Sequence, residues 1–371
     1  MAVFVITFVI LVALIAVGWI TLSAYIGYRL VNAGSSRHHI AITARTTSTL
    51  TLQKTHETVQ PGTYGVWVAE RRGHLLAGPV VGETANTVTR EVIAEHGSTS
   101  ELSGAEFTGH THFSPSDLAY DYVDVELTSE AGVIPAWHIT PPLSSDSDMW
   151  AIHVHGIGST RTGALRTVVA AANCHEQSLV MAYRNSSEGP RLPRSASMLG
   201  QTEWKDLEAA VHYALSHGAR SVTVYAWSMG AAILNCFLAQ SELSPSVTKA
   251  VLIAPALDWN VILRDRVVRA HLPAIFARHA LGVLASPLSR FLGLSQPYSP
   301  TLAATENIAW PPTLIIHSPD DPEVPVDVSR IFIRHHPDTH LVELPSQLHA
   351  CEYNVDPERF ETVITEWSTT P

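Results

Sequence analysis

The chain opens with one long apolar run, after which short apolar stretches alternate with polar segments. From Met1 to Tyr28 the sequence reads MAVFVITFVILVALIAVGWITLSAYIGY and contains no charged side chain. About 20 such residues are enough for a helix to cross the hydrocarbon layer of a membrane. Trp19, Tyr25 and Tyr28 lie toward one end of the run, where interfacial aromatic residues are found. The pattern predicts a transmembrane anchor over residues 1–30.

A secretory signal peptide is the competing interpretation, and a buried core helix is a second one. A signal peptide has a basic n-region, a shorter apolar stretch and a small-residue cleavage site, whereas this run is long and has no basic n-region. Four basic residues, Arg29, Arg37, Arg45 and Lys54, follow the run before the first acid, Glu57. By the positive-inside rule, we expect the downstream chain to lie in the cytoplasm, although large domains can override that bias.

Residues 31–117 are predicted to form a linker and a small β-rich region. Residues 31–55 are rich in Ser, Thr and small residues, which is typical of a linker. Short runs with turn residues between them, GVWVAE, HLLAGPVVGE and TVTREVIAE, are typical of strands. The next segment, DYVDVELTSEAGVIPAWHITP, predicts a hairpin.

From Met149 onward, strands and helices alternate. Apolar strands such as MWAIHV, SVTVYAW, KAVLIAP and PPTLIIHS are separated by amphipathic runs such as WKDLEAAVHYALSHGA and PERFETVITEW. Such alternation predicts a parallel sheet with helices on both faces, here over residues 118–371. Residues 259–305 are too many for a simple crossover and carry apolar residues at helical spacing, so we expect them to form a helical cap.

Composition excludes some classes of protein. The 371 residues have a net charge of −11 and no basic stripe with interleaved aromatics, so we expect no nucleic-acid partner. Cys174, Cys236 and Cys351 are widely spaced and odd in number, which argues against a disulfide framework or a metal pair and suits a reducing compartment. The sequence contains no phosphate-binding or dinucleotide-binding glycine loop, and we expect no cofactor.

A candidate nucleophile lies where a buried strand meets a helix. The segment Ala226-Trp227-Ser228-Met229-Gly230 follows the nucleophile-elbow pattern G-x-S-x-G, with Ala226 as a small substitute for the first glycine. The serine of such an elbow occupies a strained turn, so its neighbours two positions away must be small. The alternative is an ordinary small-residue turn between a strand and a helix.

A glycine-rich turn, His155-Gly156-Ile157-Gly158, follows the strand MWAIHV. A loop at this place exposes backbone N–H groups, one of which joins the N–H after the nucleophile in an oxyanion hole. We therefore assign the oxyanion donors to Ile157 and Met229. The alternative is a plain loop that ends the strand.

The acid and the base are expected in two later loops. Asp320 and Asp321 follow the strand PPTLIIHS, and an acid there can fix the tautomer of a catalytic histidine. We favour Asp321, with Asp258 as a further candidate. Among the 20 histidines, position selects His349, which lies between the final strand and the final helix. His340 begins that strand and is less suitable as a base.

The chain resembles the α/β-hydrolase superfamily, and most of all bacterial members near the dienelactone-hydrolase and prolyl-oligopeptidase-like branches. The resemblance covers about residues 118–368 and rests on VHGIGSTR, TEWKDLEAAVHYALSHGA, VYAWSMGAA, HSPDDPEVP and the His349 loop followed by NVDPERFE. It implies a hydrolase of an ester, thioester or amide with Ser228, Asp321 and His349 as its triad. The region before residue 118 lies outside the resemblance.

The expected function is hydrolysis of a lipophilic carboxylic ester at a membrane, since the cap is apolar and an anchor is nearby. A peptidase of the prolyl-oligopeptidase-like type is the alternative within enzymes, although the short β region is too small for the propeller domain of such enzymes. A membrane-tethered binding protein on an inactive hydrolase fold is the alternative outside enzymes. Metal binding is not expected at His153 and His155, which lie in a buried strand, or at His110 and His112, whose side chains are expected to be solvated.

Overall fold

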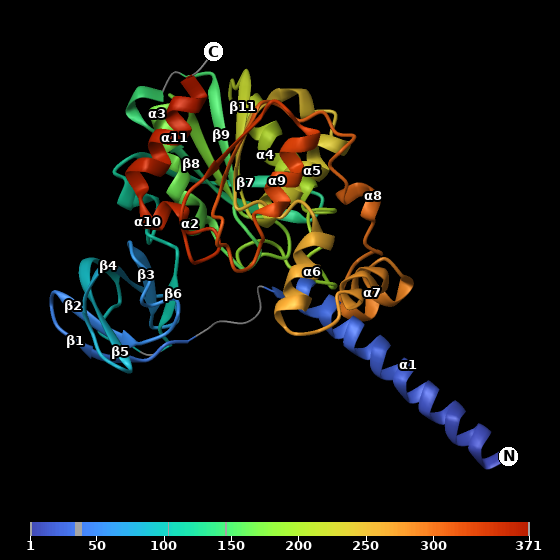
Figure 1. Ribbon diagram of the computed structural model, residues 1–371. Helices are drawn as coiled ribbons and strands as arrows, with labels where there is room; N and C mark the ends of the chain where they lie inside the picture. Colours follow the sequence, from blue (N-terminus) through green and yellow to red (C-terminus); the bar gives the residue numbers. More distant parts are fainter. Residues whose placement is uncertain (1, 34–38, 103, 145–146, 370–371) are drawn as a thin grey trace.

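The computed structural model describes residues 2–33, 39–102, 104–144 and 147–369. It contains a long N-terminal helix, a small antiparallel sheet and a larger mixed sheet covered by helices, which follow one another along the chain (Figure 1). Part of the predicted linker, residues 34–38, lies outside the described residues.

The N-terminal helix α1 (Ala2–Val31) has two different surroundings along its length. Large apolar side chains from Phe4 to Val17 are exposed, between 48 and 84 % of their surface, whereas Leu30 and Val31 are buried in the core of the larger unit. Within the described residues, α1 is the one helix whose length and composition allow it to cross a membrane. Its far end is part of the globular fold, because Val31 O accepts a hydrogen bond from Ser197 N (2.9 Å).

The first sheet is antiparallel, with strand order β1-β2-β5-β4-β3-β6. Its strands are β1 (Ile42–Arg45), β2 (Thr49–Gln53), β3 (Tyr64–Val68), β4 (Gly73–Glu83), β5 (Thr87–Gly97) and β6 (Glu106–Thr108). The interpretation of residues 31–55 as a linker is wrong over β1 and β2. Leu50 and Leu52 alternate with threonines and are fully buried in the core of this sheet, so the Thr-rich composition conceals a strand of period two.

The second sheet has eight strands in the order β14-β13-β12-β11-β9-β10-β8-β7, and all strands but β7 and β8 are parallel. The strands are β7 (Asp121–Ser129), β8 (Gly132–Thr140), β9 (Met149–Val154), β10 (Gln177–Met181), β11 (Ser221–Trp227), β12 (Val247–Ile253), β13 (Thr313–His317) and β14 (Thr339–Glu343). The predicted hairpin is confirmed as β7–β8, and the predicted parallel sheet is confirmed from β9 onward.

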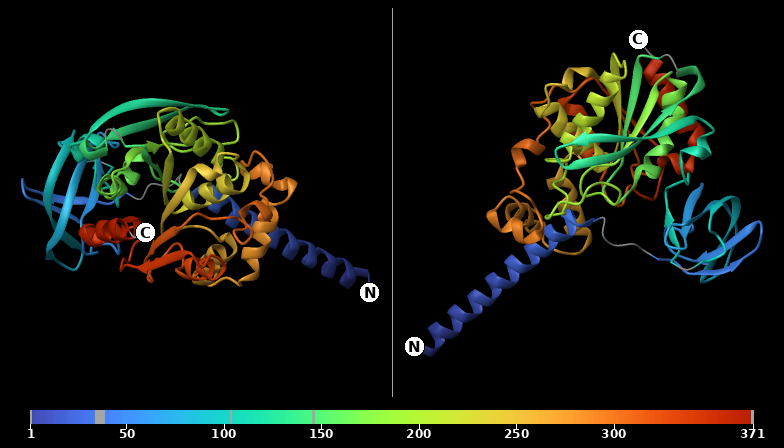
Figure 2. Two further views of the ribbon diagram at one scale, coloured as in Figure 1. Left: turned by 90° about the horizontal axis from the view of Figure 1, so that it is seen from above. Right: turned by 180° about the vertical axis from the view of Figure 1, so that it is seen from behind.

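Helices cover both faces of the second sheet, as expected (Figure 2). One face packs against α4 (Trp204–Ser216), α5 (Met229–Gln240) and α9 (Asp327–His335), and the other against α2 (Arg161–Ala164), α3 (Val168–Asn173) and α11 (Pro357–Thr369). Strand β11 shows the division, because Val224 and Ala226 join the first layer while Tyr225 and Trp227 join the second.

The expected cap lies between β12 and β13. It consists of α6 (Trp259–Arg269), α7 (Ile275–Leu284), the 3-10 helix η6 (Pro287–Leu292) and α8 (Pro300–Ala303). The remaining short elements are η2 (Pro115–Leu118), η3 (Pro142–Ser144), η4 (Leu165–Thr167), η5 (Ser244–Ser246) and α10 (Glu352–Val355). In each view the cap lies beside the end of α1 where that helix joins the globular part (Figures 1 and 2).

A buried ion pair joins the end of β10 to α4. Asp206 accepts hydrogen bonds from Arg184 Nε (2.9 Å), Arg184 Nη2 (2.8 Å) and Ser129 Oγ (2.5 Å). The Asp206 side chain is fully buried and that of Arg184 is 3 % exposed. Asp206 lies in the first turn of α4, where an acid is common. Here it also neutralises the buried guanidinium of Arg184.

Replacement of Asp206 by Asn is expected to lower the free energy of unfolding by about 3–5 kcal/mol, because it removes the fully buried carboxylate that pairs with Arg184 and leaves the buried guanidinium with the exposed Glu130. Urea denaturation of the detergent-solubilised chain measures the change. The matched control is Asp148→Asn, which breaks the exposed pair of Asp148 with Arg220 and should cost no more than about 1 kcal/mol. Equal losses in the two variants would contradict the structural role of the buried pair.

Candidate active site

Ser228 occupies a strained turn between β11 and α5. Its backbone has φ +49° and ψ −113°, a conformation that side-chain-bearing residues rarely adopt. Gly230 makes this turn possible, because a Cβ at that position would lie 2.6 Å from the carbonyl oxygen of Val154 on the neighbouring strand β9. The sequence requirement for a small residue two positions after the serine therefore comes from the close approach of α5 to β9.

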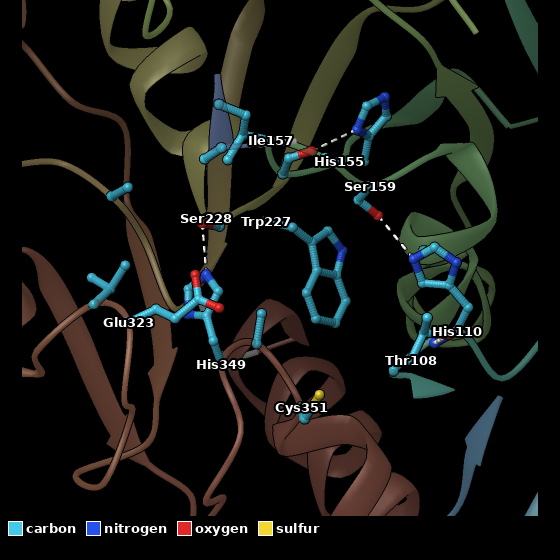
Figure 3. A pocket seen from close by; sticks show the side chains of 18 of the residues that line it. Thr108, His110, His155, Ile157, Ser159, Trp227, Ser228, Glu323, His349 and Cys351 are labelled. Carbon is cyan, nitrogen blue, oxygen red and sulfur yellow. Dashed lines mark hydrogen bonds between the residues drawn. The ribbon is translucent and has the colours of Figure 1, made fainter. Parts of the chain in front are cut away.

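The structure brings the predicted acid, base and nucleophile into one line of hydrogen bonds. His349, in the loop after β14, has Nε2 2.7 Å from Ser228 Oγ and Nδ1 2.7 Å from Asp321 Oδ2. Figure 3 shows the His349 ring directed at the serine. Asp321 is held in the loop after β13, because its Oδ1 accepts the backbone N–H groups of Glu323 (2.8 Å) and Val324 (2.9 Å).

The other two acids considered from the sequence lie elsewhere. Asp320 is exposed, and its carboxylate accepts a hydrogen bond from Gln347. Asp258 caps the start of α6, where its Oδ1 accepts the backbone N–H groups of Asn260 and Val261. Of the three candidates, Asp321 is the one whose carboxylate is hydrogen-bonded to His349 within the described part of the chain.

Charge interactions around His349 favour its protonated form. Burial by itself would lower the pKa of His349, but the charge of Asp321 and the hydrogen bond to it outweigh burial and raise the pKa to about 9. The pKa of Asp321 is lowered in turn: burial opposes ionisation, but the His349 charge and hydrogen bonds from His317 and His349 favour the carboxylate. The pair is therefore arranged to hold a proton on His349 and a negative charge on Asp321.

Glu352 is a further buried acid beside this pair. It is 1 % exposed, and its Oε1 accepts a hydrogen bond from Ser318 N (2.9 Å). Burial and the nearby charge of Asp321 raise the pKa of Glu352 to about 7. When ionised, its charge contributes to the raised pKa of His349.

The glycine-rich loop after β9 lies against the serine. A Cβ at Gly156 would be 3.1 Å from Ser228 Cβ, so this backbone approaches the nucleophile closely. Ile157 and Gly158 line the same cleft as Ser228. His155 is buried behind the loop, stacked on Tyr183 with ring centroids 4.3 Å apart. The loop thus lies next to Ser228.

The cleft around Ser228 has a volume of about 640 Å³ and is built from four parts of the chain. The second sheet and its loops supply most of it, Trp259 and Arg266 come from the cap, and Leu30 and Ala33 at the end of α1 add to its wall. The first sheet and the segment that follows it contribute Arg71 and His110. The sequence analysis left this N-terminal region without a role, because no local signal links it to residues far along the chain.

The expectation that His110 is solvated is wrong. His110 is 7 % exposed, its Nε2 lies 3.0 Å from Ser159 Oγ, and its Nδ1 lies 3.3 Å from Thr162 Oγ1 (Figure 3). Burial lowers the pKa of His110 well below the usual range, so the ring is neutral. This residue joins the first sheet to the loop after β9 through a neutral hydrogen bond.

Trp227 both packs and lines the cleft. It is 2 % exposed, lies 6.0 Å from the Phe360 ring in a stacked arrangement, and has the Arg166 guanidinium 3.9 Å from its ring centroid. Arg166 also donates to Ala350 O (2.7 Å), next to His349. Through these contacts Arg166 links Trp227 to the loop that carries His349.

The histidine pair in β9 makes hydrogen bonds within the protein. His153 is fully buried, with Nδ1 2.8 Å from Thr167 Oγ1 and Nε2 3.0 Å from Ser178 Oγ. Across the described ranges of the chain, no group of three or more His, Cys, Asp or Glu side chains is arranged to hold a metal ion.

The second sheet, its two helical layers and the serine at the strand-to-helix turn form an α/β-hydrolase fold. Structures of the Pyrococcus furiosus esterase Pf2001 share this fold. One, in space group P21, has 21% sequence identity and a TM-score of 0.52, and the match covers 69% of this chain and 95% of the esterase. Another, in space group P212121, has 20% identity and a TM-score of 0.52 and covers 69% and 93% of the two chains.

The first sheet is similar to a family of its own. Residues 40–107 match a family described as "Domain of unknown function (DUF8805)". No curated protein matches the chain in sequence. The two parts that meet at the cleft thus have different relatives.

For a reaction in which His349 acts as the base, turnover is expected to rise with pH up to about 9, because His349 accepts a proton only in its neutral form and its pKa is raised to about 9. Glu352→Gln removes a negative charge that favours protonated His349, so the rise in kcat/KM should move to lower pH. The control is Glu358→Gln, at an exposed position of α11. A pH–rate profile that is identical in wild type and Glu352→Gln would show that Glu352 does not act on His349.

Proposed function

We propose that the chain is a serine hydrolase that cleaves a carboxylic ester through an acyl-enzyme. The observation that supports this most is the line of 2.7 Å hydrogen bonds from Asp321 through His349 to Ser228. Together with the strained backbone of Ser228, this is the arrangement that activates a serine hydroxyl. The branch of the superfamily, dienelactone-hydrolase-like or prolyl-oligopeptidase-like, stays a prediction.

In the first step of the proposed mechanism, Ser228 Oγ attacks the ester carbonyl carbon while its proton moves to His349 Nε2. Asp321 holds the ring through Nδ1 and stabilises the imidazolium that forms. The carbonyl oxygen becomes an oxyanion, for which the backbone N–H groups of Ile157 and Met229 are the proposed donors. Met229 is the first residue of α5, so its N–H is one of the groups at a helix start that lack an intrahelical acceptor.

Collapse of the tetrahedral intermediate completes the acylation. His349 gives its proton to the departing alkoxide, and the alcohol leaves while the acyl group stays on Ser228. In the second step, His349 takes a proton from water, and the resulting hydroxide attacks the acyl carbon. Collapse of that intermediate returns the proton to Ser228 Oγ and releases the acid. No cofactor takes part in these steps.

The proposed substrate is a small or lipid-like ester with an apolar acyl chain. Apolar side chains from three regions, Leu30, Ile157 and Trp259, line the cleft together with Ser228. A peptidase and an inactive binding protein are the other outcomes that a substrate panel would reveal. If purified enzyme shows no preference for longer acyl chains, the lipophilic substrate is wrong.

We also propose that α1 is an uncleaved anchor and that the catalytic unit lies in the cytoplasm. Leu30 and Val31 are part of the hydrophobic core, so removal of α1 as a signal peptide would strip the fold of packed residues. The proposed organisation is an anchor over residues 1–30, a β-rich region to residue 117 and a catalytic domain from residue 118 with its cap at about 259–305. We expect no nucleic-acid partner for a protein organised in this way.

The first expected result concerns the nucleophile. A fluorophosphonate probe should label the full chain in detergent or membranes, because an activated serine attacks phosphorus as it does a carbonyl carbon. Ser228→Ala should abolish labelling and lower ester hydrolysis by about 10⁴-fold or more. The control is Ser221→Ala, at the opposite end of β11. Folded wild type that resists the probe would overturn the hydrolase mechanism in favour of the binding protein.

The second expected result concerns topology. In bacterial cells a green fluorescent protein fused after the C-terminus should fluoresce, because it folds in the cytoplasm, and the fusion should stay in the membrane fraction after alkaline carbonate washing. Alkaline phosphatase fused at the same place should be inactive. The reverse pattern would place the catalytic unit outside the cytoplasm.

A further inference from the structure

The cap runs alongside α1 where that helix enters the globular part. The Trp19 ring stacks on Phe276 with centroids 4.1 Å apart, and Trp19 Nε1 donates to Nδ1 of His279 (3.3 Å). Farther along α1, a Cβ at Gly27 would lie 3.2 Å from Leu284 Cγ. Helix α7 therefore runs parallel to α1, and its first turn lies beside Trp19.

This pairing sets the depth of the cap relative to a bilayer that α1 crosses. The side chain of Phe4 is exposed, and a crossing stretch of roughly 20 residues that is counted from Phe4 ends near Ser23. Trp19 lies within that stretch, close to its end. The first turn of α7 and the loop before it therefore lie at the level of the lipid headgroups, next to α1 (Figure 1).

The surface presented at that level is apolar and basic. We call residues 269–278, from the end of α6 to the first turn of α7, the cap tip. Pro273, Ala274 and Ile275 are exposed, and Ile275 leaves 42 % of its surface uncovered. Of the two arginines of the cap tip, Arg269 pairs with Asp265, whereas Arg278 forms no ion pair with any of the described residues. Apolar residues flanked by arginine are typical of surfaces that enter a membrane interface.

Charge separates the candidate occupants of this surface. Residues 266–305 contain four arginines and no Asp or Glu, although the whole chain has a net charge of −11. An anionic lipid surface attracts such a segment. The anchor also holds the cap tip at the membrane, so the local concentration of lipid exceeds that of any soluble partner.

The cleft opens beside the same elements. Leu30 and Ala33 of the α1 end, and Trp259 and Arg266 of α6, line the cleft that contains Ser228. The wall of the cleft thus includes parts of α1, which contacts the cap tip at Phe276, and of α6, whose last residue begins the cap tip. An ester held in the bilayer would reach the cleft along α1 and α6.

We propose that the cap tip docks on an anionic lipid surface and places the mouth of the cleft against the bilayer, so that esters enter from the lipid phase. The entry of esters rests on the proposed hydrolase function. The docking itself depends on the anchor and the cap tip, and it can be tested without catalysis.

The docking test uses the full chain in vesicles of phosphatidylglycerol and phosphatidylcholine. Ile275→Cys is labelled with the environment-sensitive dye NBD, and the three native cysteines are buried. We expect blue-shifted emission that spin-labelled lipids quench. The control is Arg220→Cys. The native Arg220 side chain is 85 % exposed and lies just before β11, at the end of that strand opposite Ser228. This label should report water.

Two results would overturn docking on lipid. In the first, NBD at position 275 reports water in the anionic vesicles. In the second, the blue shift is insensitive to spin-labelled lipid and grows with the amount of protein per vesicle, which would show that a second copy covers the cap tip.

The entry of esters is tested by activity in the same vesicles. Ile275→Glu combined with Arg278→Glu should lower hydrolysis of a long-chain ester in the bilayer by about tenfold, because it replaces attraction to the anionic surface by repulsion. Hydrolysis of a short water-soluble ester should be unchanged. The control, Arg220→Glu, reverses an exposed charge away from the cap tip and should alter neither rate.

Equal losses on both esters would overturn lipid-phase entry and point to damage to the cleft. If wild type hydrolyses neither ester while the NBD label still reports lipid, the proposed hydrolase function fails and the docking stands.

Discussion

The close approach of β9 to the start of α5 is the constraint on which the rest of the site depends. Gly230 leaves no room for a Cβ beside Val154 O, and Gly156 leaves little beside Ser228. These two contacts hold the serine turn and the glycine-rich loop together at the carboxyl ends of neighbouring parallel strands. Ser228, the proposed nucleophile, and the proposed oxyanion donors thus share one rigid support, which is where preorganised donors act most strongly.

Buried acids around His349 create opposing requirements. Asp321 is stabilised as a carboxylate by backbone N–H groups and by His349, and it raises the pKa of that histidine to about 9. The same negative charge, together with burial, raises the pKa of Glu352 to about 7. Near neutral pH the charge of Glu352 therefore changes with pH, and the protonation of His349 depends on both neighbouring acids.

The cleft is lined by parts of the chain that are similar to different proteins. The α/β-hydrolase unit supplies Ser228, whereas the region of the DUF8805 match supplies Arg71 and is followed by His110, which binds Ser159. Helix α1 contributes its last turn to the wall of the cleft and packs its middle against the cap. Helix α1, the β-rich region and the cap therefore all contribute residues to the wall of the cleft that contains Ser228.

The sequence by itself determined the apolar helix, the alternation of strands and helices and the identity of Ser228, Asp321 and His349 as residues that meet. Each of these depends on a local period or on a turn at a strand end, which neighbouring residues encode. The strands β1 and β2 escaped detection because their threonines resemble a linker. Only the tertiary structure placed His110 at the cleft, Glu352 beside the acid and α7 along α1, because these contacts join residues far apart in the chain whose proximity depends on packing and not on any local pattern.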